Sequence, residues 1–186
     1  MNKAKLMNRF LGSALALLGS LALQSSSVAA QTLVKPVQAM LGSAAIVDDA
    51  NRDKVTLAGK FVGVNSTAPG GTSAVFHYNL GSCEVCGTDP DPIPPHLKLR
   101  YRDNGTGSNV IAKLKEYNQE TGIERILLTF DSEQWPQSSS YQRQGITGAP
   151  TVFDFEKNVY FIEVTLKRFD TTGAPSIGAI QFGIAK

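Results

Sequence analysis

The sequence predicts an all-β protein, an antiparallel β-sandwich of jelly-roll or immunoglobulin-like type with about eight strands, following a signal peptide. Two observations carry this prediction. Segments in which apolar and polar side chains alternate with a period of two recur from residue 54 to the C-terminus. Most are separated by short runs rich in Gly, Pro, Asn, Asp and Ser, the residues that turns require. We therefore expect antiparallel neighbours joined mostly by tight turns, within one domain spanning residues 54–186.

The clearest strand is predicted over residues 159–169, where one face carries four apolar side chains: Tyr160, Ile162, Val164 and Leu166. A helical face through part of this segment is conceivable, so periodicity alone does not decide. Seven of the eleven residues are β-branched or aromatic, and such residues pack well on a pleated sheet and lose rotamer freedom in a helix. We expect a long, half-buried strand against which other strands pair or pack.

Seven further strands are expected. In order they cover residues 55–64, 74–80, 97–101, 110–117, 123–131, 151–155 and 180–184. In the strand over 123–131, Ile126, Leu128 and Phe130 are expected on one face, and the last strand is expected inside a sheet. Two longer loops, 81–96 and 132–150, remain between strands.

Residues 1–30 have the layout of a secretory signal peptide. Three basic residues without an acid precede an apolar run, and small residues end the segment. We therefore expect a protein that is secreted or located in the periplasm or cell envelope. Removing this segment leaves 156 residues with 15 Lys and Arg against 16 Asp and Glu, a net charge of −1. The basic pI of the full chain thus belongs to the signal peptide and gives no support for nucleic-acid binding. No later segment is long and apolar enough to span a membrane.

Residues 31–53 are the hardest part of the sequence to interpret. Residues 32–37 could form an edge strand, since Pro36 would interrupt a central one, and residues 38–47 could form a short helix. A charged connector follows. We expect a loosely attached arm or linker ahead of the sandwich domain.

The sharpest local motif is Cys83-Glu84-Val85-Cys86. In an exported protein with no other cysteine, Cys83 and Cys86 are expected to form a disulfide. Thioredoxin-like redox chemistry is disfavoured because the prolines that follow prevent the helix it uses. The alternative is a zinc site, since the chain's two histidines flank the pair and give the tetrahedral set His77, Cys83, Cys86 and His96.

The loop over residues 132–150 carries three candidate ligand-binding residues: Trp135, Tyr141 and Arg143. Aromatic side chains beside polar ones are the usual components of a sugar-binding surface, and loops often carry binding residues. The competing interpretation is that Trp135 and Tyr141 fold back and cover the end of the sandwich. Phe161, on the polar face of the long strand, is a further candidate for contact with a partner.

Motifs for most enzyme classes are absent from the sequence. It contains no G-x-S-x-G, no H-E-x-x-H and no glycine-rich phosphate loop, so we expect no cofactor. The favoured function is a non-enzymatic exported module that binds a glycan, a cell surface or a protein partner through its long loops. One alternative is a secreted hydrolase with a carboxylate pair, for which Asp131, Glu133 and Glu163 are the first residues to test. The other is a structural envelope or matrix protein that self-associates.

Overall fold

The computed structural model describes residues 34–81 and 91–185. The predicted signal peptide and both cysteines lie outside the described residues, so the signal peptide and the disulfide stay predictions. Within the described residues, no helix has the length and apolar character needed to cross a membrane.

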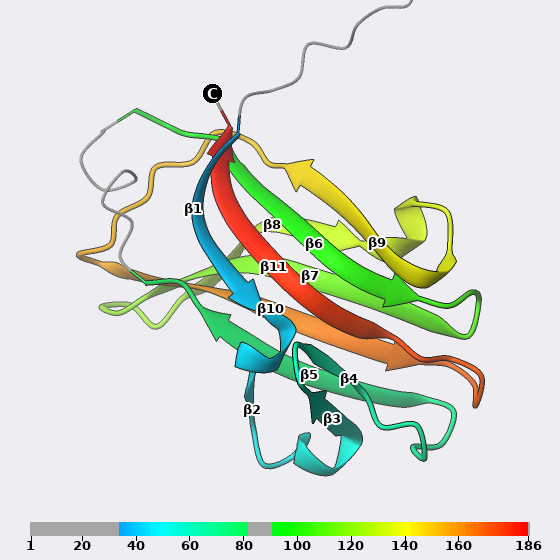
Figure 1. The fold of residues 1–186 in the computed structure, drawn as a ribbon. Coiled ribbons are helices and arrows are strands. Elements are labelled where there is room, and N and C mark those ends of the chain that lie inside the picture. Colours follow the sequence, from blue (N-terminus) through cyan, green and yellow to red (C-terminus); the bar gives the residue numbers. More distant parts are fainter. Residues whose placement is uncertain (1–33, 82–90, 186) are drawn as a thin grey trace, which may run out of the picture. The chain divides into compact units, whose positions relative to one another are not determined.

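The described chain forms two antiparallel sheets, which confirms the predicted fold class (Figure 1). Sheet A has the order β3 (Val55–Ala58), β4 (Phe61–Val64), β11 (Ser176–Ala185), β6 (Pro95–Asp103) and β9 (Ser138–Thr147), with β1 (Val34–Leu41) also paired to β11. Sheet B has the order β2 (Ile46–Val47), β5 (Thr72–Asn79), β10 (Asn158–Arg168), β7 (Ser108–Asn118) and β8 (Glu124–Asp131). Three short 3-10 helices are η1 (Gly42–Ala44), η2 (Arg52–Lys54) and η3 (Ser132–Gln134).

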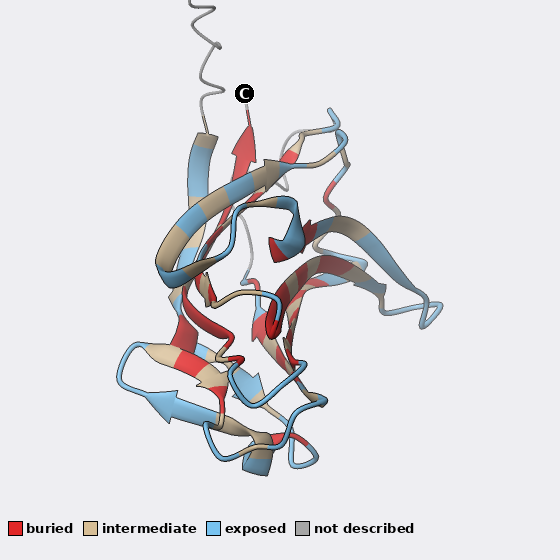
Figure 2. Ribbon diagram, turned by 90° about the vertical axis from the view of Figure 1, so that its right-hand side faces the viewer, coloured by how far each residue is buried: buried red, intermediate tan, exposed pale blue. Residues whose placement is uncertain are grey.

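Each sheet is built around one central strand. In sheet B this is β10, whose predicted inner face is confirmed, because all four of its apolar residues are buried. In sheet A it is β11, which pairs with β1, β4 and β6. The two inner faces form one core that includes Phe76, Leu99 and Phe182. Figure 2 shows the buried segments concentrated between the sheets and exposed ones at loops and turns.

Two predicted strands are different in the structure. The expected single strand 55–64 is a hairpin, because Gly59 adopts a positive φ of 59° and lets β3 turn back into β4. In β8 a register shift opposite Leu114 and Lys115 breaks the alternation. Ile126 is consequently 50% exposed, and Leu127 packs against the core together with Leu128.

The N-terminal segment belongs to the sandwich. Residues 38–41, expected to begin a helix, continue β1, which pairs with β11 from Val34 to Leu41. Val37 and Met40 pack against the core. A register irregularity between Pro36 and Gln38 accommodates the proline in this edge strand. The segment that the sequence suggested as a loose arm therefore supplies a strand of sheet A.

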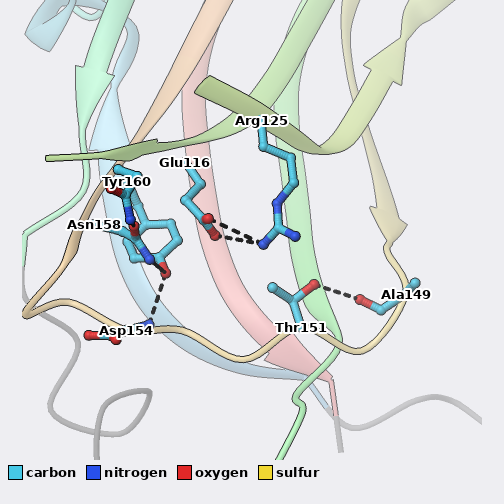
Figure 3. A network of polar contacts seen from close by, with 8 residues as sticks. Glu116, Arg125, Ala149, Thr151, Asp154, Asn158 and Tyr160 are labelled. Atoms are coloured by element: carbon cyan, nitrogen blue, oxygen red, sulfur yellow. Dashed lines mark hydrogen bonds and ion pairs between the residues drawn. The ribbon is translucent and has the colours of Figure 1, made fainter. Parts of the chain in front are cut away.

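The segment between β9 and β10 covers one end of the sandwich (Figure 3). The strand predicted at 151–155 is reduced to a single bridge between Ile93 and Thr151. Phe153 instead turns inward, with its ring centroid 5.0 Å from that of Tyr160. The Tyr160 hydroxyl accepts a hydrogen bond of 2.9 Å from the backbone N–H of Asp154, which fixes the segment over the core. Aromatic packing and this hydrogen bond, with only one bridge of sheet pairing, therefore hold the segment.

Candidate functional site

The outward face of sheet A carries the candidate site. Leu97, Leu99 and Tyr101 of β6 are buried, so the residues between them project away from the core. The register continues this face onto β9, where Arg143 lies opposite Arg100. Its principal side chains come from three strands and are Phe61, His96, Lys98, Arg100, Arg102, Tyr141 and Arg143. We call these residues the sheet A face.

An aromatic stack occupies the centre of this face. The rings of Phe61 and Tyr141 lie 4.6 Å apart between centroids, at 21° to one another. The Tyr141 hydroxyl is 2.9 Å from the Ser176 hydroxyl, which fixes the ring plane. Gly178 makes room for the stack, since a Cβ at this position would lie 3.2 Å from the Phe61 ring. The stack is therefore a rigid element built on the backbone of sheet A.

Arginine side chains surround the stack. The guanidinium carbons of Arg100 and Arg102 lie 5.4 and 5.8 Å from the centre of the Tyr141 ring, within cation–π range. Arg102 also donates from Nε to the Ala174 carbonyl at 3.2 Å. A guanidinium near an aromatic ring can still donate N–H groups from its edge, in the fork that matches a carboxylate or sulfate.

Among the described residues that face outward on sheet A, none is acidic, so these positive charges are not balanced there. Lys98, Arg100, Arg102 and Arg143 make no ion pair with any described carboxylate. Arg100 and Arg143 are direct cross-strand partners, an arrangement in which like charges repel and destabilise the sheet. A local arrangement that costs stability without a structural gain is typical of a functional site.

His96 adds no positive charge to this face near neutral pH. Burial, and then the charge of Lys98, lower the pKa of its imidazole. Its Nδ1 lies 2.9 Å from the Thr147 hydroxyl, and its ring lies against Gly145, where a Cβ would be 3.0 Å from Nε2. The charge of the sheet A face therefore rests on one lysine and three arginines.

The structure divides the three ligand candidates predicted from the sequence. Tyr141 and Arg143 share one face of β9, two residues apart, within a ten-residue strand and not in a long loop. Trp135 lies apart from them, stacked on the buried Phe130 with 4.6 Å between ring centroids. Trp135 is half-buried and packs against the core. The interpretation that it covers the core agrees with this contact.

The zinc alternative involves histidines that the structure does not bring together. His77 lies on the outward face of sheet B, with Nε2 3.7 Å from Glu163 Oε2, whereas His96 lies on the outward face of sheet A. Cys83 and Cys86 are outside the described residues. Among the residues that are described, no group of three or more His, Cys, Asp or Glu is placed to hold a metal ion.

Two of the three carboxylates proposed for hydrolysis, Asp131 and Glu163, have local partners, and the third, Glu133, is exposed in η3. Asp131 Oδ1 accepts hydrogen bonds from Asn109 Nδ2 and the Glu133 N–H, at 3.2 and 3.1 Å. Glu163 Oε2 is paired with Lys115 Nζ at 2.6 Å. A carboxylate that sequence reasoning missed, Asp103, is buried, and burial raises its pKa. At 1% exposure its carboxyl is shielded from solvent and therefore from a polymeric substrate.

Sequence reasoning also missed four members of the sheet A face, Phe61, Lys98, Arg100 and Arg102. A partial signal was present: in the strand predicted at 97–101 and in the Arg102 that follows it, apolar residues alternate with three cations, and no acid lies on the polar side. Phe61 was hidden because the segment was expected to be a single strand, broken at Gly59 and Gly63, and not a hairpin. The hairpin at Gly59 pairs Phe61 with Ala58 and places the Phe61 ring on the outward face.

Comparisons with known proteins identify no family. No family model matches the chain, and no curated protein matches it. Solved structures with a similar arrangement include a carbohydrate-binding module of Cellvibrio mixtus lichenase 5A in complex with cellotriose (11% identity, TM-score 0.44, 80% of this chain and 98% of that one). Another is a C-terminal module of LamC from Zobellia galactanivorans (11% identity, TM-score 0.45, 78% of this chain and 98% of that one). A third is the xylan-binding module CBM15 (11% identity, TM-score 0.43, 83% of this chain and 98% of that one).

Proposed function

We propose that the protein is an exported, non-enzymatic β-sandwich module that binds a glycan through the sheet A face. One observation carries the proposal: a rigid Tyr141–Phe61 stack, edged by arginines with no acidic partner, lies on the outward side of a sheet. An apolar surface combined with a few fixed polar donors is the usual composition of a binding site for a small or extended ligand.

The surroundings of the stack favour an extended ligand. The outward positions of β11 between Phe61 and the arginines of β6 are small, with Gly178 and Ala179 next to one another. The backbone surface beside the stack is therefore low, and a polymer chain can lie across the strands in contact with the ring edge and the guanidinium groups. Donors mounted on strands keep their geometry better than donors on loops.

Hydrolysis is less well supported than binding. Glycoside cleavage uses two carboxyl groups on either side of the scissile bond. The described outward positions of sheet A contain none, and Asp131 and Glu163 are held by hydrogen bonds or ion pairs elsewhere. The sheet A face offers donors and an aromatic stack, which suit recognition without bond cleavage.

Affinity gel electrophoresis against a panel of neutral and acidic polysaccharides tests this proposal. We expect at least one polysaccharide to retard the wild-type protein. Tyr141→Leu should abolish the retardation, because it removes the ring and its hydroxyl while keeping apolar bulk against Phe61. Phe161→Leu, an equivalent change on the outward face of sheet B, is the matched control and should leave retardation intact. Failure of every polysaccharide, or equal loss in both folded variants, would contradict the proposal.

A further inference from the structure

We propose that the ligand of the sheet A face is an anionic polysaccharide carrying carboxylate or sulfate groups; the inference rests on the glycan-binding function proposed above. The first ground is the charge on this face. It holds four permanent cations, Lys98, Arg100, Arg102 and Arg143, and no described carboxylate faces outward beside them. A neutral glycan would leave these cations without any counter-charge, whereas an anionic one supplies it.

The second ground is the geometry of the donors. Arg100 and Arg143 are exposed and lie opposite one another on β6 and β9. Their like charges repel in the free protein, and an anion placed between them would interact with both. Arg102 and Lys98 lie two residues to either side of Arg100 along β6, about 7 Å away at strand spacing. The cations therefore form a row along β6 that suits a repeating anionic polymer better than a single small anion.

The third ground separates a polysaccharide from a nucleic acid. Proteins that bind single-stranded nucleic acid stack successive bases on exposed aromatic faces. On the sheet A face the two rings stack on each other, and the guanidinium groups of Arg100 and Arg102 lie near the Tyr141 ring. The arginine edges remain available for carboxylate or sulfate oxygens, which guanidinium binds in a bidentate manner.

This recognition does not require a basic protein. The chain beyond residue 30 has a net charge of −1, so its acids must be located elsewhere. On sheet B the outward residues Glu124 and Glu163 both pair with Lys115. The four cations of the sheet A face have no described acid beside them, so their combined field can orient and attract a polyanion there.

The experiment measures retardation of the full secreted protein in gels containing polygalacturonate, dextran sulfate, dextran or poly(dT). We expect polygalacturonate, dextran sulfate or both to retard the protein, with retardation falling as NaCl rises, and dextran to have no effect. The stronger of the two anionic gels identifies the group recognised as carboxylate or sulfate. Arg100→Ser with Arg143→Ser should weaken the apparent affinity roughly tenfold for each arginine lost.

The matched control is Lys113→Ser with Lys167→Ser, which removes the same charge from the outward face of sheet B. It should retain binding; an equal loss in both double variants would show a dependence on net charge and overturn the inference. Binding of a neutral polysaccharide that survives loss of both arginines would overturn the inference and leave the glycan-binding function standing. If no polysaccharide binds, both this inference and the proposed glycan-binding function are wrong. Retardation by poly(dT) equal to or stronger than that by either anionic polysaccharide would overturn the inference in favour of a nucleic acid.

Discussion

The two outward faces of the sandwich treat charge in opposite ways. On sheet B, Lys115 Nζ lies 2.6 Å from Glu163 Oε2 and 2.7 Å from Glu124 Oε1, so a cation is matched by two acids. On sheet A, Arg100 faces Arg143 across the strands, and no described acid pairs with either. The central cation of sheet B, Lys115, is thus paired with acids, although Lys113 and Lys167 on the same face are not, whereas no cation of the sheet A face pairs with a described acid. This difference, more than the aromatic content of either face, supports the proposal that sheet A carries the binding surface.

The largest expected effect comes from a residue that belongs to neither face. Trp135→Ala removes a half-buried ring that stacks on Phe130, and we expect the free energy of unfolding to fall by about 3 kcal/mol. Chemical denaturation measures this loss, with exposed Gln137→Ala in the same segment as control. Polysaccharide retardation of the folded variant should not change. Lost binding in a stable Trp135→Ala protein would make Trp135 a ligand residue and break the comparison between the faces.

The second prediction concerns the paired face. Lys115→Met leaves Glu163 and Glu124 without their cation, and we expect a loss of about 2 kcal/mol, because unpaired and partly buried carboxylates are costly. Glycan binding should be unaffected. A variant as stable as wild type would show that the Lys115 pairs contribute nothing, and sheet B would then differ from sheet A in composition only.

A pH titration checks the cause of that loss. Burial lowers the pKa of Lys115, but the hydrogen bonds to Glu124 and Glu163 outweigh it, so the pKa in the folded protein lies above the ordinary value of 10.5. The stability that Lys115 contributes is then fully present below pH 10.5 and is lost as pH rises through the raised pKa. The difference in free energy of unfolding between wild type and Lys115→Met should therefore shrink as pH rises through this pKa. If the difference in free energy of unfolding stays constant in alkaline solution, Lys115 stabilises the protein through packing and not through its charge.

The sequence was sufficient for the central strands of the sheets because these strands have strong alternation. The inner residues of β10 and β11 could be read directly, since burial on one side enforces a period of two. The edge strand β9 has no such signal. Its sequence, SSSYQRQGIT, is polar on both faces, because an edge strand buries little on its inner side. It was therefore expected to be a loop, although it pairs with β6 from His96 to Tyr101.

The candidate site was predictable only in part, because local sequence shows residue types but not which strands lie side by side. Tyr141 and Arg143 stood out by residue type, but their neighbours Phe61 and Arg100 come from strands far away in the sequence. Only the strand order β4-β11-β6-β9 brings them together, and strand order cannot be read from local periodicity. Trp135 shows the converse problem, since its residue type suggested binding whereas its position places it against Phe130.

The smallest expected change in stability is also the sharpest test of the sheet A face. Arg143→Glu places an acid opposite Arg100 and converts a repulsive cross-strand pair into an attractive one. We expect the free energy of unfolding to rise by about 0.5 kcal/mol at low salt, measured by chemical denaturation, and the gain to fade as salt screens the pair. The free energy of unfolding of the neutral variant Arg143→Gln should lie between those of wild type and Arg143→Glu.

Polyanion binding should move in the opposite direction, with Arg143→Glu losing more affinity than Arg143→Gln. A mutation that stabilises the fold while it removes binding separates function from stability, because a residue kept for structure alone cannot show both effects. Loss of stability in Arg143→Glu would mean that the Arg100–Arg143 arrangement is structurally favourable. The two outward faces would then not differ in the way proposed, and the absence of an acid on sheet A would need a structural explanation.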